Sequence, residues 1–99
     1  MTDKIAEIKA RFDHEAAKQI LREKYEAKML FAVFGGMWKA GPELINILNA
    51  SYGEILYLPD EYGNPCKVPR HKFLTIVNER WQEQMNAWHD EFEKTMRMR

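Results

Sequence analysis

Two long, charged, amphipathic helical patterns bracket a short β-rich centre, and this layout constrains the fold more than any other feature of the chain. The second pattern runs from about Pro69 to Met98, and its apolar residues recur at steps of three and four, which places them in one stripe on a helix. At roughly 1.5 Å per residue this helix is about 40 Å long, whereas a domain of this size has a radius of gyration of about 13 Å. We therefore expect it to extend beyond the core of its own chain. The stripe consists of Phe73, Leu74, Val77, Trp81, Met85, Trp88, Phe92 and Met96.

The first helical pattern extends to about Lys28 and has the same character. Charges of both signs cover the rest of its surface, and Glu7 and Arg11 form an i,i+4 pair in the favourable order. We expect one apolar face on this helix that drifts slowly around its axis. That face consists of Ile5, Ile8, Phe12, Ala16, Ile20, Leu21 and Tyr25.

The apolar run from Met29 to Phe34 breaks the helical pattern and is followed by the pair Gly35-Gly36. Two short extended runs across a Gly-Gly pair predict a β-hairpin, with the turn at the two glycines. The alternative is that the first helix continues through Phe34, since Met, Leu and Ala favour helix.

The remaining elements follow from turn and cap signals. Gly41-Pro42-Glu43 predicts the start of a short helix, which ends near Ser51-Tyr52-Gly53, with Gly53 suited to a left-handed cap. A strand over 54–58, a turn over 59–65 and a returning strand over 66–68 predict a second hairpin. The sequence therefore predicts one α+β domain over 1–99, with two hairpins in a small four-stranded antiparallel sheet and helices stacked on one of its faces.

Charge and composition exclude several classes of protein. The chain has 15 basic and 15 acidic residues and no basic block, so the field that attracts nucleic acid or anionic membranes is missing. No apolar run approaches the roughly 20 residues of a membrane span, and the polar start of the chain does not resemble a signal peptide. A lone cysteine, Cys66, fits a reducing compartment and is expected as a buried strand residue. We expect a cytoplasmic protein that binds neither nucleic acid nor membrane.

Motifs for chemistry are incomplete. His14-Glu15 resembles the start of a zinc-protease helix, but Lys18 occupies the position of the second histidine. The glycine spacing of a phosphate loop between Gly36 and Gly41 is followed by Pro42-Glu43 in place of the required Lys-Ser or Lys-Thr.

Two further groups are equally unconvincing as sites. His89, Asp90 and Glu93 lie close in sequence, but only His89 and Glu93 share a helix face and no fourth ligand is identifiable. Cys66 has no base beside it, and His71 follows only after a proline. We therefore predict no catalytic residues, no metal site, no cofactor and no enzymatic activity.

The aromatic residues of the last helix point instead to a protein contact. Trp81 and Trp88 are seven residues apart and share a face, and we expect the internal core to end before Trp88 and Phe92. Base stacking is a poor explanation because acidic residues surround them. Tyr62, in the second hairpin turn, is expected either to fold back onto the domain or to contact the partner. The predicted interface residues are Trp81, Met85, Trp88, Phe92 and Tyr62.

Three stretches carry a resemblance to known proteins. They are LREKYEAKMLF at 21–31 running into Gly35-Gly36, DEYGNP at 60–65, and RWQEQMNAW at 80–88. Together they resemble small proteins encoded by T-even-like tailed bacteriophages, including marine ones, over roughly residues 20–92. The resemblance implies a small virion or prohead-assembly protein, in the virion or the host cytoplasm, and it transfers no functional residue.

The sequence thus favours a non-enzymatic interaction protein, a phage structural or assembly component that self-associates or binds a partner protein through its last helix. One alternative is a phage-encoded inhibitor or adaptor that docks on a host protein. A second alternative is a small-ligand or nucleic-acid binder.

Overall fold

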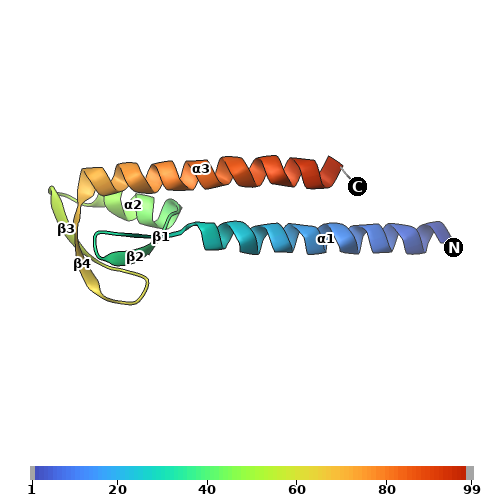
Figure 1. Ribbon diagram of the computed structural model, residues 1–99, viewed down its shortest axis with the longest axis horizontal. Helices are drawn as coiled ribbons and strands as arrows, with labels where there is room; N and C mark the ends of the chain where they lie inside the picture. Colours follow the sequence, from blue (N-terminus) through green and yellow to red (C-terminus); the bar gives the residue numbers. More distant parts are fainter. Residues whose placement is uncertain (1, 98–99) are drawn as a thin grey trace.

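A computed structural model describes residues 2–97, with side chains described for 4–97, and Met98, the predicted end of the last helix, lies outside this range. The order helix, hairpin, helix, hairpin, helix is as predicted, and the α+β class is confirmed (Figure 1). The molecule is elongated, measuring 64 × 23 × 21 Å. Its elements are α1 (Thr2–Lys28), β1 (Leu30–Val33), β2 (Gly36–Lys39), α2 (Pro42–Ala50), β3 (Ile55–Pro59), β4 (Pro65–Pro69) and α3 (Arg70–Arg97).

The chain forms the predicted first hairpin and not the alternative, in which the first helix continues through Phe34. The turn of this hairpin lies one residue earlier than predicted. Phe34 and Gly35 form the turn, with φ of 50° and 76°, and Gly36 is already the first residue of β2. Positive φ at both central residues is the requirement of a type I′ turn, which matches the twist of the strands. The indole Nε1 of Trp38 donates a hydrogen bond of 2.8 Å to the Val33 carbonyl and fastens the hairpin across this turn.

The second hairpin, β3 with β4, forms a sheet of its own, so the predicted four-stranded sheet is wrong. The turn of this hairpin, and not a strand, contacts β2. Glu61 donates its backbone N–H to the Met37 carbonyl at 2.8 Å, and the Asp60 carboxylate accepts the Met37 N–H at 3.1 Å. These bonds satisfy the backbone carbonyl and N–H of Met37, which a third strand of the sheet would otherwise bind. The Met37, Asn64 and Tyr62 N–H groups that Asp60 accepts also hold the pKa of its carboxyl below the usual value.

Gly36 is required where the two hairpins meet. A Cβ built on it would lie 2.9 Å from the Cys66 Sγ and 3.0 Å from the Asp60 Cβ, closer than side chains pack. The sequence therefore uses its glycine pair for two purposes, Gly35 for the turn and Gly36 for close approach. Cys66 is free and buried in β4, as predicted.

The core lies between the hairpins, α2 and the first turns of α3. Phe73 is fully buried at its centre, and its ring contacts those of Phe31, Phe34 and Trp38, with centroids 4.8–6.4 Å apart. Aromatic pairs at these distances add stabilisation beyond the burial of their area. The buried cluster comprises Met29, Trp38, Ala40, Leu48, Cys66, Val68, Phe73 and Val77.

Helix α2 begins at Pro42 after Gly41 and ends at Ala50, close to the predicted end, but Gly53 is not its cap. Ser51 is the C-cap, and Gly53, with φ of 92°, lies in the following connection. The Nε of Arg70 donates to the Gly53 carbonyl at 2.8 Å, and the backbone N–H of Arg70 donates to the Glu54 carbonyl at 2.8 Å. The first residue of α3 therefore fixes the connection from α2 to β3.

Helices α1 and α3 lie side by side in opposite directions, and their far ends point the same way (Figure 1). The Tyr25 and Trp88 rings stack at 5.9 Å, and Lys24 pairs with Glu91 at 2.7 Å. Because both helices have the same rise per residue, this antiparallel alignment places Arg97 beside about residue 17 of α1. The last helix extends beyond the core, as expected, and the first helix extends further still within the described residues.

Candidate protein-interaction surfaces

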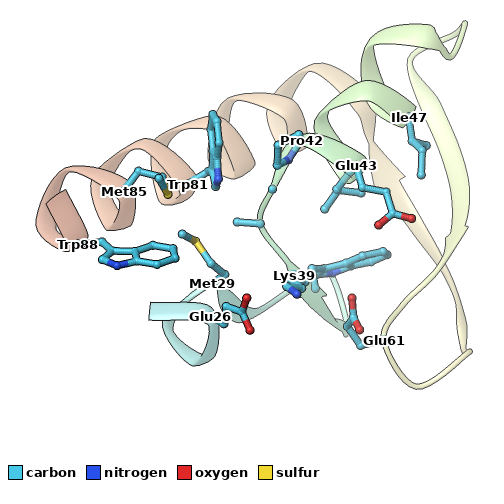
Figure 2. Close-up of a pocket in the computed structure, with 14 residues that line it drawn as sticks. Glu26, Met29, Lys39, Pro42, Glu43, Ile47, Glu61, Trp81, Met85 and Trp88 are labelled. Carbon is cyan, nitrogen blue, oxygen red and sulfur yellow. The ribbon is translucent and has the colours of Figure 1, made fainter. Parts of the chain in front are cut away.

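A pocket of about 370 Å³ opens between the C-terminal end of α1, strand β2, helix α2 and the middle of α3 (Figure 2). Three of the five predicted interface residues, Trp81, Met85 and Trp88, line it from α3. Met29 and Trp38 contribute from the first hairpin region, and Ile47 contributes from α2. The stripe on α3 thus forms one wall of a concave site and not a flat exposed face.

Charged side chains surround this apolar pocket. Glu26, Glu43 and Glu61 come from α1, α2 and the second hairpin turn, and Lys39 comes from the end of β2 (Figure 2). All four side chains are exposed. The carboxylates outnumber the ammonium group, so the mouth of the pocket favours a cationic neighbour over an anionic one.

Trp88 lies beyond the core cluster, whose last neighbour on α3 is Met85, and it joins the two long helices instead. Its ring stacks on Tyr25, which is buried, with an interplanar angle of 6°. Beside this stack, the Lys24 ammonium lies 2.7 Å and 3.0 Å from the two Glu91 carboxylate oxygens. The Lys24 hydrogen bond holds the pKa of Glu91 below its usual value, and the same bond raises the pKa of Lys24. Burial raises the pKa of Tyr25, and nearby Glu91 raises it further.

The other two predicted interface residues lie outside the pocket. Phe92 is half-buried on α3 and does not line it. Tyr62 is 75% exposed at the tip of the second hairpin, so the alternative in which it folds back onto the domain is wrong. The structure therefore brings together Trp81, Met85 and Trp88 but neither Phe92 nor Tyr62.

A second surface, on α1, was missed because its residues were assigned to the same apolar face as Leu21 and Tyr25. Ile5, Ile8, Phe12 and Ile20 are 60–76% exposed, whereas Leu21 and Tyr25 are buried. At 3.6 residues per turn, the centre of the exposed stripe lies roughly 160° around the helix from Tyr25. This angular separation is readable from the sequence and divides the apolar residues of α1 into two faces.

The described residues do not gather the side chains that a metal site needs. No group of three or more His, Cys, Asp or Glu side chains within residues 2–97 could hold a metal ion. His89 and Glu93 approach to 3.8 Å on the exposed surface of α3. No helix in the described part of the chain is both long enough and apolar enough to cross a membrane.

No protein-family model matches this chain, and neither the curated proteins nor the solved structures gave a match. The resemblance to proteins of T-even-like phages therefore stays a prediction from the sequence.

Proposed function

We propose that this chain is a non-enzymatic interaction domain that holds an apolar side chain of a partner protein in the pocket beside α3. The observation that supports this most is the convergence of Trp81, Met85 and Trp88 on one concave surface. Partly exposed tryptophan and methionine side chains in a pocket are the residues that most often dominate binding energy at protein interfaces.

The charges around the pocket define the partner further. Glu26, Glu43 and Glu61 surround an apolar floor, and Lys39 is the cation among the described residues that line the pocket. An aromatic or aliphatic anchor flanked by Lys or Arg is the segment that this arrangement favours, because opposite charges at a rim speed association and select partners.

The biological setting follows the sequence resemblance. We infer a small structural or assembly component of a tailed phage, acting in the virion or the host cytoplasm. A phage-encoded inhibitor or adaptor that docks on a host protein is the alternative. Mass spectrometry of purified virions separates these two, because only a structural component stays in the particle at stoichiometric amounts.

A second candidate function is the binding of a small apolar ligand. The volume of the pocket, about 370 Å³, lies within the roughly 300–1,000 Å³ typical of ligand sites. A ligand of this kind would occupy the same floor of Trp81, Met85 and Trp88 as the proposed anchor.

Selection from a library of random peptides tests the proposal. We expect enrichment of peptides with one large apolar residue next to Lys or Arg. Ile47→Lys places a cation at the pocket edge and should weaken binding of the selected peptides at least about tenfold. Asn49→Lys is the matched control, since Asn49 is exposed on the same helix and does not line the pocket. Peptides that bind both variants equally would contradict the proposal. If the selection enriches no peptide but an apolar dye binds in the pocket, the small-ligand function is favoured instead.

A further inference from the structure

The outer edge of strand β2 borders the pocket beside α3. In an antiparallel pair, successive residues of a strand point their N–H and C=O groups alternately toward the neighbouring strand and away from it. The Ala40 N–H donates to the Met29 carbonyl at 2.9 Å, so the N–H and C=O of Lys39 point away from β1. Met37, two residues earlier, points the same way, and its groups are the ones that the second hairpin turn binds. The edge of β2 is therefore covered at Met37, and it becomes open toward Lys39.

The open part of this edge continues past the end of β2. Gly41 has φ of 168° and ψ of 176°, which is fully extended backbone, and its C=O accepts the Ile45 N–H at the start of α2. The outward groups that follow Met37 are the Lys39 N–H, the Lys39 C=O and the Gly41 N–H, and no hydrogen bond from another segment of residues 2–97 occupies them. The space beside Gly41 is also open, since a Cβ built on it would have no atom other than its chain neighbours within 4 Å. Residues 39–41 thus offer three backbone groups to a further strand.

Prolines interrupt the edges of the second hairpin in a way that has no counterpart here. The Arg70 N–H donates to the Glu54 carbonyl at 2.8 Å, and this bond fixes which residues of β3 and β4 point outward. Pro59, Pro65 and Pro69 all occupy outward positions. Proline has no N–H to donate, and it protects an exposed edge from pairing with another strand. The edge over 39–41 contains no proline.

We propose that the partner protein of the proposed function, on which this inference rests, binds as an extended segment that adds a strand to the edge of β2 at Lys39 and Gly41. An added strand gains affinity from its main-chain hydrogen bonds and specificity from pockets for alternate side chains. Residues directly opposite each other on paired strands point to the same face. Trp38 and Ala40 are buried and line the pocket. The residue of the segment that lies opposite Ala40 is therefore the apolar anchor.

The charges at the two ends of this edge define the neighbours of the anchor. Glu61 is bound to β2 at one end, and Glu43 follows Gly41 at the other. Both carboxylates are exposed and line the pocket, and Figure 2 shows them on the side away from Trp88. The two neighbours of the anchor point away from the pocket floor and toward this rim, where cationic side chains meet the carboxylates. The expected segment is extended, with a basic residue on each side of one large apolar residue.

Amide hydrogen exchange of the full chain, measured residue by residue by NMR, tests the added strand. The probe is the tightest peptide from the library selection. At saturating peptide, exchange of the Lys39 and Gly41 N–H groups should slow at least about tenfold, because both become hydrogen-bonded. Ala32 is the matched control, since its N–H points outward from the opposite edge of the same hairpin, and its exchange should stay within about twofold. Unchanged exchange at Lys39, with a peptide that Ile47→Lys weakens, would overturn the added strand and leave the proposed function standing.

Methylation of single backbone nitrogens in the same peptide is a second test, which leaves the protein unchanged. Methylating the nitrogen that donates to the Lys39 carbonyl should raise the Kd at least about tenfold, whereas methylating the next nitrogen on either side should raise it less than about threefold. The sensitive nitrogen belongs to a neighbour of the anchor in an antiparallel pair and to the anchor itself in a parallel pair. A peptide that binds as a helix would instead lose affinity at several successive nitrogens, and that result would overturn the added strand. A selection that enriches no peptide would overturn the proposed function and the added strand with it.

Discussion

Helices α1 and α3 have nearly the same length, 27 and 28 residues, and both carry apolar stripes among dense charge, yet the fold uses them differently. The stripe of α3 begins in the core, where Phe73 and Val77 are fully buried, and continues along the pocket to the contact with α1. The N-terminal half of α1 leaves its stripe in water. Periodicity therefore predicts that a helix has an apolar face, but not what covers that face.

Chain order explains the difference. Helix α1 reaches the core only at its C-terminal end, through Leu21, Tyr25 and Met29. Helix α3 starts in the core and returns along α1, so its far half is covered by the part of α1 nearest the hairpins. The outermost part of α1 has no described segment of α3 beside it, and this is where the exposed Ile5, Ile8 and Phe12 lie.

The largest expected effect is a gradient of stability along the two helices. Phe73→Ala should lower the free energy of unfolding by about 3–5 kcal/mol, because it empties the fully buried centre of the core. Trp88→Ala should lower it by about 1–3 kcal/mol, since it removes a half-buried ring and its stack on Tyr25. Phe12→Ala should change it by less than about 0.5 kcal/mol.

Urea unfolding below about 1 μM protein measures this gradient without a contribution from self-association. Circular dichroism at zero denaturant serves as the control for folding of each variant. A loss of more than about 2 kcal/mol for Phe12→Ala at this concentration would mean that the stripe of α1 packs within its own chain, and the contrast between the helices would fail.

Sequence reasoning succeeded where local chemistry decides the structure. Pro42 at a helix start and the clustered turn residues around Gly63 each specify their element almost alone. It failed where distant segments meet, because only the approach of Cys66 and Asp60 shows why Gly36 cannot have a side chain. The predicted pairing of the two hairpins was wrong for a similar reason, because the hydrogen bonds that join them, between Met37 and the residues Asp60 and Glu61, link positions more than 20 apart.

The candidate site was predicted in part for the same reason. The stripe on α3 correctly grouped Trp81, Met85 and Trp88, because three- and four-residue steps fix a helix face. The opposite wall of the pocket, from Trp38 to Ile47, depends on how the first hairpin and α2 pack. Periodicity alone carries no information about that packing.

A smaller effect concerns the ion pair that joins the two helices. The pKa of Glu91 is lower in the folded chain than its value of 4.5 in the unfolded chain. The stabilisation from Glu91 is therefore fully present above pH 4.5, and it is lost as the pH falls through the lower, folded-state pKa. Lys24, whose pKa is raised above 10.5, loses its contribution only as pH rises through that higher value. Glu91→Gln should therefore lower Tm at pH 7, and the difference from the wild type should shrink toward pH 3.

Differential scanning calorimetry at pH 7, 5 and 3 measures this difference. Glu83→Gln is the control, because it makes the same change at an exposed position of α3. A difference between Glu91→Gln and the wild type that does not vary with pH would mean that the pairing of Lys24 with Glu91 does not join α1 to α3 in solution.

The smallest expected effect is at Tyr62, an exposed aromatic residue in the turn of the second hairpin. That hairpin lies at the opposite end of the molecule from the N-terminus of α1 (Figure 1). The Tyr62 backbone N–H donates to the Asp60 carboxylate at 3.0 Å, and Tyr62→Ala keeps this bond while removing only the ring. We therefore expect the free energy of unfolding to change by less than about 0.5 kcal/mol. The Kd of pocket-bound peptides should also be unchanged, because Tyr62 does not line the pocket. A lower Tm would show that the ring packs on the domain after all, whereas weaker binding of the selected peptides would extend the contact with the partner to the second hairpin.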